Sequence, residues 1–274
     1  MTCILISRLS YTSGRAIAHD AARSLGYEVV DKEIFQEASV TSGVSESKLL
    51  KAFQDPPTLF GMSSSTRKRY VVHVSAALAK RFLKGNVIYQ GPFGYPLITG
   101  VSHVLKVRIF AQREDRVAAM VDREPGLSAT EAEKAILKQD GARAALAKQV
   151  FQTEDDDANL FDLVINTSQV DTPSAVEIIT NTAKLKRYQS MTYSIRCMEN
   201  LELGLRVRAH VTDVDVDAEV EADGGSVRIR THGGGELKKR KLSEIRQRVA
   251  TLKGVETVEV EMVEDKLDRI AGNG

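Results

Sequence analysis

Cysteine and long apolar runs are scarce in this chain, and their scarcity excludes several classes of protein. Two cysteines, Cys3 and Cys197, occur among the 274 residues. They are too few and too far apart for a disulfide framework or a zinc site, and the apolar run around Cys3 predicts a small buried residue there. No apolar run reaches the roughly 18 residues that a transmembrane helix needs, so we expect no membrane span.

An excess of charge of either sign is also missing. The formal net charge is +1, from 38 Lys and Arg against 37 Asp and Glu. This balance supplies no overall attraction to nucleic acid or to an anionic membrane, and it argues against nucleic acid as a partner. The first residues lack the basic region that precedes the apolar core of a signal peptide, so we expect a cytoplasmic protein.

The composition is otherwise that of a globular protein. Hydrophobic residues make up 42% of the chain and charged residues 27%, which is enough apolar material for a sizeable core. The length predicts one large domain or two ordinary ones.

The N-terminal stretch has the order strand, polar loop, helix, strand. Residues 3–6 form a short apolar run, residues 7–15 are mostly small and polar, and apolar residues then recur at helical spacing until Gly26. A second short apolar run ends at Asp31. This order predicts the start of an α/β fold whose loop binds phosphate, because backbone N–H groups of the loop and of the helix N-terminus face an anion.

The formal phosphate-loop motif, G-x-x-x-x-G-K-S/T, is met only in part. Leu9 stands at the first glycine, Gly14 is kept, Arg15 replaces the lysine and Ala16 replaces the hydroxyl residue. On the pattern alone, an ordinary strand–helix start with a polar loop remains open as the alternative.

Several further segments resemble the cytidylate-kinase-like family of P-loop nucleoside monophosphate kinases. They are Ser7-Arg8, S-G-R-A-I-A at 13–18, L-G-Y at 25–27, D-K-E-I at 31–34 and N-T-S at 166–168. The family opening reads roughly I-S-R-x-x-G-S-G-G-R-x-I-A, and an arginine in place of the loop lysine is normal for it. Tyr11 and Ser13 occupy two of its glycine positions.

The resemblance covers about residues 1–185 and implies a fold and an activity. The implied fold is α/β, a P-loop kinase-like parallel sheet flanked by helices over residues 1–188. The implied activity is transfer of the γ-phosphoryl group of ATP, with Mg²⁺, to a nucleotide acceptor. The implied nucleotide-binding residues are Ser10, Thr12, Ser13, Gly14, Arg15, Ala16, Asp31 and Lys32. No protein residue is predicted as a metal ligand.

Three arginines are the implied catalytic residues. Arg15 closes over the loop, and Arg116 and Arg143 lie on two charged helices that in nucleoside monophosphate kinases form a lid over the transferring group. Asp140 and Arg143 match the family's D-x-x-R pattern. A solvent-facing helix with i,i+4 ion pairs is the alternative for these charges, and for Asp31 the alternative is a cap on the next helix.

Other departures from the family leave a second interpretation open. Gly91 is kept after a predicted strand, but Pro92 stands where the family has an arginine near the phosphates. With Tyr11, Ser13 and Ala16, this favours a kinase-like protein that has lost catalysis and acts by binding partners. Enzyme and binding protein both remain open.

Two charged segments have competing interpretations. The basic residues 67–69 begin a predicted helix, where they contact substrate phosphate or form a solvated face. The segment 152–159 contains four consecutive acids, which favours a flexible acidic loop over a metal site.

The C-terminal part predicts a separate small α+β domain. Polar and apolar residues alternate over 217–222 and 226–230, on the two sides of a Gly224-Gly225 turn, which indicates a hairpin. Apolar residues at helical spacing follow over 237–252, and a last strand begins near residue 255. The segment resembles a BON-type module, which gives a predicted domain at 200–264. The resemblance implies a protein or phospholipid-surface partner, and the glycines and lysines at 233–241 either bind phosphate or form a solvated helix end. The oligomeric state is not predicted.

Overall fold

We analysed a computed structural model of the chain, which describes residues 2–9, 11–57, 61–232 and 237–263. Its first part holds β1 (Cys3–Arg8), α1 (Gly14–Leu25), β2 (Glu28–Val30), α2 (Glu33–Ser42), α3 (Glu46–Gln54), α4 (Ser64–Phe82), β3 (Val87–Tyr89), α5 (Gly94–Leu97), β4 (Val104–Phe110), α6 (Arg113–Arg123), α7 (Ala129–Phe151), β5 (Leu163–Asn166) and α8 (Thr172–Ala183). The second part holds α9 (Thr192–Val211), β6 (Glu219–Asp223), β7 (Ser226–His232), α10 (Leu237–Ala250) and β8 (Thr257–Val263). Short 3₁₀ turns lie at η1 (Ala158–Leu160) and η2 (Lys186–Tyr188).

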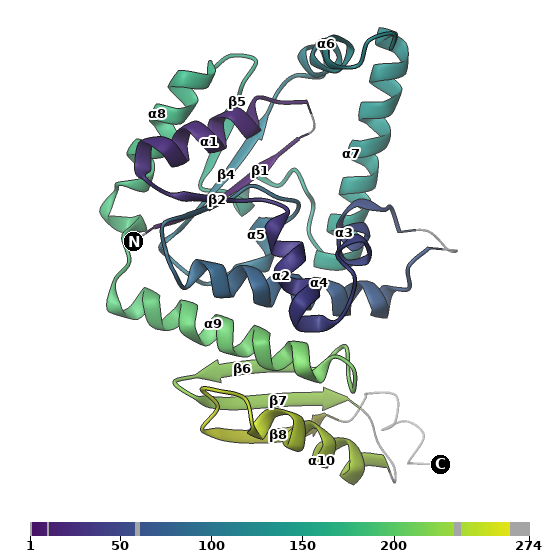
Figure 1. Ribbon diagram of the computed structural model, residues 1–274, viewed down its shortest axis with the longest axis vertical. Coiled ribbons are helices and arrows are strands. Elements are labelled where there is room, and N and C mark those ends of the chain that lie inside the picture. The colour runs from purple at the N-terminus through teal and green to yellow at the C-terminus, as the bar shows by residue number, and fades with distance from the viewer. Residues whose placement is uncertain (1, 10, 58–60, 233–236, 264–274) are drawn as a thin grey trace.

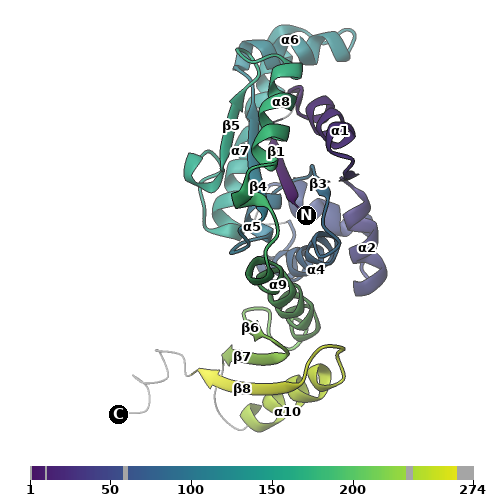
Figure 2. The same cartoon turned by 90° about the vertical axis from the view of Figure 1, so that its left-hand side faces the viewer.

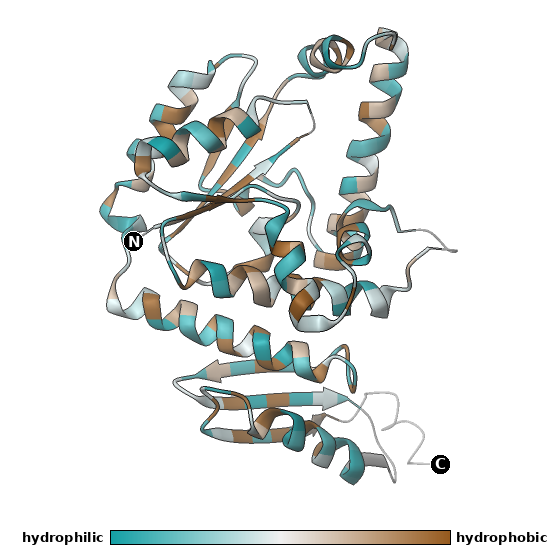
Figure 3. Cartoon of the chain, in the orientation of Figure 1, coloured by the Kyte–Doolittle hydropathy of each residue, from teal (hydrophilic) through white to brown (hydrophobic). Residues whose placement is uncertain are grey.

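The first sheet has five parallel strands in the order β2-β3-β1-β4-β5. Helices cover both faces (Figures 1 and 2), as parallel sheets require, since crossover helices bury each face. In β1, Ile4 and Ile6 pack toward α1 and α8, while Cys3 and Leu5 pack toward α2 and α4. The middle strands are mainly hydrophobic in colour in Figure 3. The parallel sheet flanked by helices that we expected is confirmed.

Helices α6 and α7 form a hairpin with a small core of its own. Met120, Ala132 and Ile136 are buried in it, and the ring of Tyr11 packs against them. A capping box begins α7: the Ser128 hydroxyl accepts from the Glu131 N–H, and the Glu131 carboxylate accepts from the Ser128 N–H. Figure 1 shows α6 at one end of the molecule and α7 running from there toward α3.

A single long helix, α9, lies between the first sheet domain and the second sheet (Figures 1 and 2). The helix runs without interruption through residues 203–209. On one face of α9, Met198 is buried in the first core, with Leu201 and Leu205 packed against that core. On another face, Leu203, Val207 and Val211 belong to the core of the second sheet.

The second sheet has the order β6-β7-β8. β6 and β7 form the predicted antiparallel hairpin about Gly224 and Gly225, whose φ values of 54° and 90° need glycine. β8 runs parallel to β7, and α10 packs beside it. This confirms a small C-terminal α+β unit, while its assignment to the BON type and the boundaries at 188 and 200 stay predictions.

Cys3 is fully buried and free, as predicted, and burial raises the pKa of its thiol to about 12. Within the described part of the chain, no helix is both long and apolar enough to cross a membrane.

Candidate nucleotide site

The polar loop joins β1 to α1 at the carboxyl edge of the first sheet. The Thr12 hydroxyl donates to the Leu9 carbonyl and accepts from the Gly14 N–H, at 3.0 and 3.3 Å, which closes the loop on itself. Tyr11 has φ +60°, a left-handed conformation that normally favours glycine. The backbone therefore keeps a conformation suited to the family's glycine, although the residue is tyrosine. Ser10 lies outside the described residues.

Gly14 is required by a close approach rather than by its φ. A Cβ placed there would lie 2.8 Å from Cβ and 2.9 Å from Cδ of Arg8, which is too close for any other residue without movement. Arg8 is thus packed directly beneath the loop. Burial lowers the pKa of its guanidinium, and the charge of Asp31 partly opposes that effect.

Four arginines gather around this loop. Arg143 Nη1 donates to the Arg8 carbonyl at 3.4 Å, the Arg123 guanidinium lies 5.9 Å from the Tyr11 ring centroid, and Arg15 is in the first turn of α1. The charges of all three further lower the pKa of Arg8. The first turn of α1 carries no acidic residue, and Ser13 makes no side-chain cap. Converging cations at an uncapped helix N-terminus form a site for an anion, because the helix dipole adds to their positive potential.

A buried network ties Arg143 to the sheet. The Ser7 hydroxyl accepts from Arg143 Nη2 and from Arg108 Nη1, each at 2.8 Å. Asp155 accepts from Arg143 Nε at 2.7 Å and from Arg108 Nη2 at 2.9 Å, and Tyr95 donates to its other oxygen. Burial raises the pKa of Asp155, but the ion pairs and hydrogen bonds with Arg143 and then Arg108 outweigh burial and leave that pKa below its usual value.

The sequence interpretation missed this network. Asp155 is buried at 7% exposure, so the prediction of a flexible acidic loop is wrong for this residue. Arg108, on β4, was not singled out either, and Arg8, at the end of β1, was noted only as part of the family resemblance and was given no role. Their signal was a charged residue inside an apolar strand pattern, which is costly to bury without a partner.

Arg143 also lies against the segment that carries Pro92. Its guanidinium is 4.9 Å from the ring centroid of Phe93, in a cation–π contact, and its side chain is 17% exposed. The Tyr89 hydroxyl donates to the Pro92 carbonyl, and a Cβ at Gly91 would collide with the Tyr89 ring. A guanidinium therefore still reaches this turn, although the arginine expected at position 92 is absent.

Arg116 is held in a different way from Arg143. Its guanidinium forms two hydrogen bonds with Asp140, at 2.7 and 2.8 Å, and so joins α6 to α7. A fork-to-fork pair of this kind fixes both side chains in orientation. Its predicted catalytic role stays a prediction, whereas its place in the α6–α7 hairpin is observed.

Asp31 follows β2 at the same edge of the sheet. No side chain caps α2, and the Asp31 N–H donates to the Glu33 carboxylate at 2.8 Å. Asp31 is therefore not a helix cap here. Burial raises the pKa of its carboxyl, while the charge of Arg8 lowers it. Lys32 is exposed beside it.

Gln90 is a further polar residue at this edge, just after β3, and the sequence interpretation did not single it out. It is 1% exposed, its Nε2 lies 3.4 Å from Nε2 of His19, and its Oε1 has no hydrogen-bond partner in the described part of the chain. A buried amide oxygen without a partner is uncommon and marks a place where a ligand can donate a hydrogen bond.

The donors around the loop suit phosphate better than a directly bound metal. Thr12 is engaged within the loop, and Ala16 has no hydroxyl. Among the described residues, no three His, Cys, Asp or Glu side chains group to hold a metal ion.

The basic residues 67–69 fit neither of their predicted interpretations. Arg67 is buried and donates to the carbonyls of Ala52 and Asp55 at 2.7 and 3.0 Å. Lys68 and Arg69 form ion pairs with Asp217 and Asp213, beyond the end of α9. All three are used in structure, one inside the first domain and two between the first domain and the second part.

Comparison with known proteins agrees with this geometry. The cytidylate kinase-like family matches residues 3–169, well over half of the chain. No curated protein matches.

Among solved structures, an uncharacterized protein from Eubacterium ventriosum ATCC 27560 is similar, with 17% identity, a TM-score of 0.51, and coverage of 66% of this chain and 97% of that one. A shikimate kinase from Bacteroides thetaiotaomicron is 12% identical, with a TM-score of 0.41 and coverage of 67% and 99%. A sugar kinase from Janibacter sp. HTCC2649 is 14% identical, with a TM-score of 0.42 and coverage of 66% and 93%. The family match and the observed fold together show that the chain belongs to the cytidylate kinase-like family.

Proposed function

We propose that the chain is a nucleotide kinase that transfers the γ-phosphoryl group of ATP to a nucleoside monophosphate, with CMP as the first acceptor to test. The observation that carries the proposal is the placement of three arginines at the N-terminus of α1: Arg8 lies against Gly14, Arg143 donates to the Arg8 carbonyl, and Arg15 is in the first turn of the helix. Asp155 pairs with Arg143, whereas Arg15 is exposed and forms no ion pair with another described residue, so its charge is available to an anion.

In this proposal the loop residues hold the donor phosphates. The N–H groups of the loop and of the first turn of α1 face the phosphate oxygens, Thr12 keeps the loop closed, and the exposed Arg15 folds over the anion. ATP supplies the transferred group together with its Mg²⁺. Phosphoryl transfer needs positioning and charge neutralisation more than covalent help, so this arrangement is sufficient in kind.

The acceptor side is formed by Asp31, Gln90 and Arg143. The carboxylate of Asp31 and the free Oε1 of Gln90 can each accept a hydrogen bond from a sugar hydroxyl or a base amino group. Arg143 is held by Ser7 and Asp155 in a fixed orientation, so it is ready to stabilise charge on the transferring group. Because α7 carries Arg143, closure of the α6–α7 hairpin would exclude water.

The deciding experiment is calorimetric titration of ATP·Mg²⁺, alone and with CMP present, followed by a coupled kinase assay. We expect Arg15→Ala to lower turnover about 100-fold or more, the usual cost of removing one donor to developing charge, with an unchanged circular dichroism spectrum. Arg23→Ala is the matched control, since Arg23 is exposed at the other end of the same helix, and it should keep full activity. Equal activity of the Arg15 and Arg23 variants would refute the assigned role.

The second candidate function is a kinase-like protein without catalysis that binds partners through its C-terminal unit. Pro92, in the place of an arginine, is the observation that favours it. If the calorimetric titrations show no binding heat for ATP·Mg²⁺, either alone or with CMP present, this alternative is supported. Binding of ATP without CMP would point instead to another acceptor, and both outcomes reject the CMP kinase assignment.

A further inference from the structure

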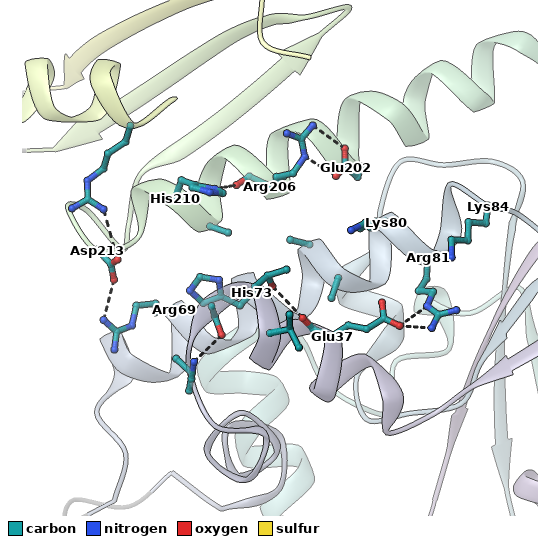
Figure 4. A pocket seen from close by; sticks show the side chains of 18 residues that line it. Glu37, Arg69, His73, Lys80, Arg81, Lys84, Glu202, Arg206, His210 and Asp213 are labelled. Carbon is teal, nitrogen blue, oxygen red and sulfur yellow. Dashed lines mark hydrogen bonds and ion pairs between the residues drawn. The ribbon is translucent and has the colours of Figure 1, made fainter. Parts of the chain in front are cut away.

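A cavity of about 650 Å³ lies between α2, α4, α9 and α10, and it includes none of the residues of the candidate nucleotide site. Figure 4 shows side chains of α9 facing those of α2 and α4 across it. Its size is within the range of pockets that hold small molecules. Since its walls come from both the first domain and the C-terminal part, the cavity exists only in the full chain.

The charges that line this cavity are unbalanced. Six lysine or arginine side chains and three carboxylates contribute to its walls. The carboxylates are already paired: Asp213 with Arg69 and Arg248, Glu202 with Arg206, and Glu37 with Arg81. The excess of positive charge is therefore available to an anion from solution.

Lys80 and Lys84 carry much of that excess. Lys80 is in the last turn of α4, Lys84 follows four residues later, and both are exposed. Neither makes an ion pair within the described ranges, although both line the cavity. Two ammonium groups at this spacing on one wall provide several donors for a phosphate group, which lysine binds as a compact point charge.

The rest of the lining bears on the part of the ligand that is not charged. No Phe, Tyr or Trp lines the cavity, and the rings in its walls are the imidazoles of His73 and His210. The other wall residues are small or aliphatic, and they include Val40, which is 82% exposed. The Thr41 hydroxyl donates to helix carbonyls and its oxygen can still accept, whereas the Ser42 hydroxyl donates to the Ala38 carbonyl and already accepts from the Val44 N–H.

We propose that this cavity binds a small phosphate ester that bears hydroxyl groups, such as a sugar phosphate. The unpaired lysines hold the phosphate, and the Thr41 hydroxyl and the wall carboxylates accept from the hydroxyl groups of the ester. The site is independent of the proposed kinase activity, because the loop residues take no part in it.

Glucose 6-phosphate is the probe, titrated calorimetrically into the full-length protein, with glucose and inorganic phosphate as comparison ligands. We expect saturable binding of glucose 6-phosphate, at least about tenfold weaker binding of inorganic phosphate, and none of glucose. The double variant Lys80→Ala/Lys84→Ala should weaken glucose 6-phosphate binding at least about tenfold. Both side chains are exposed, so the fold should be kept, and a thermal melt checks this.

The matched control is Lys48→Ala/Lys51→Ala on α3, which removes the same charge, including a lysine from the last turn of a helix, away from the cavity. It should bind like the unmodified protein. Val40→Trp changes an exposed wall residue without removing charge, and by filling the cavity it should also weaken binding.

Three outcomes overturn the proposal. One is the absence of glucose 6-phosphate binding, and another is equal loss in the two lysine double variants. The third is loss of glucose 6-phosphate binding in Arg15→Ala with retention in the Lys80/Lys84 variant, which would place the ligand at the loop instead.

Discussion

At the scale of single residues, Tyr11 is the clearest conflict between side chain and backbone. Its φ of +60° favours glycine, yet its hydroxyl donates to the Glu124 carboxylate and its ring packs against the α6–α7 core. The tyrosine therefore links the phosphate loop to the hairpin that carries Arg143. The contact with the hairpin offsets the conformational cost of the left-handed backbone at Tyr11.

This conflict predicts an inverted order of stability for two variants. Tyr11→Ala and Tyr11→Gly lose the same ring contacts, but only alanine keeps a Cβ in the left-handed region. We expect Tyr11→Gly to be the more stable by about 1 kcal/mol in urea unfolding, because strain of about 1–2 kcal/mol exceeds the gain of about 0.4–1 kcal/mol that alanine brings by restricting the unfolded chain. An alanine variant as stable as the glycine variant would show that the loop is not held left-handed.

At the scale of secondary-structure elements, glycines inside helices have opposite roles in α1 and α7. Gly14, in the first turn of α1, lies against Arg8, whereas a Cβ at Gly141, in the middle of α7, would meet nothing within 4 Å. Glycine in an open helix interior costs about 0.5–1 kcal/mol relative to alanine.

We expect Gly141→Ala to raise the free energy of unfolding by about 0.5–1 kcal/mol and Gly14→Ala to lower it by about 1–3 kcal/mol through overpacking. Denaturant unfolding of the two single variants measures both. A destabilised Gly141→Ala would mean that α7 needs flexibility at this point, and a neutral Gly14→Ala would mean that Arg8 can move away from the loop.

At the scale of the whole molecule, α9 belongs to two cores. Ion pairs also join the two parts, but Lys68–Asp217 and Arg69–Asp213 are half exposed, and such pairs contribute about 0–1 kcal/mol each. Burial of one large apolar side chain contributes about 1.5–3 kcal/mol. Apolar packing of α9 on α4 is therefore the main connection between the parts.

Removal of all residues after Gln189 should consequently destabilise the first domain. It exposes the part of the first core that Met198, Leu201 and Leu205 cover, so we expect a lower melting temperature and increased binding of a hydrophobic dye. A second truncation, after Val211, keeps α9 and should melt at a higher temperature than the shorter chain. Identical melting of the two truncations would contradict the bridging role. If the chain that ends at Gln189 loses partner binding, the chain that ends at Val211 is needed to separate a lost binding surface from a destabilised first domain.

The sequence by itself determined the local elements and their order. Apolar periodicity predicted the opening strand, helix and strand of an α/β fold, and the Gly224-Gly225 turn predicted the C-terminal hairpin, because these signals act between residues close in the chain. The parallel sheet was an expectation from the family resemblance. The loop from Thr12 to Ala16, with Arg15 exposed beside it, could also be located in advance.

The tertiary structure decided which charges meet and which face each helix covers. Arg108 and Asp155 are 47 positions apart, and the cavity beside Lys80 needs α9 and α10 from the far end of the chain. The sequence could not assign these contacts, since a charged residue has the same local pattern whether its partner is water or a distant carboxylate. Burial resolved the ambiguity, because a charge removed from water is stable only beside an opposite charge or a hydrogen-bond partner.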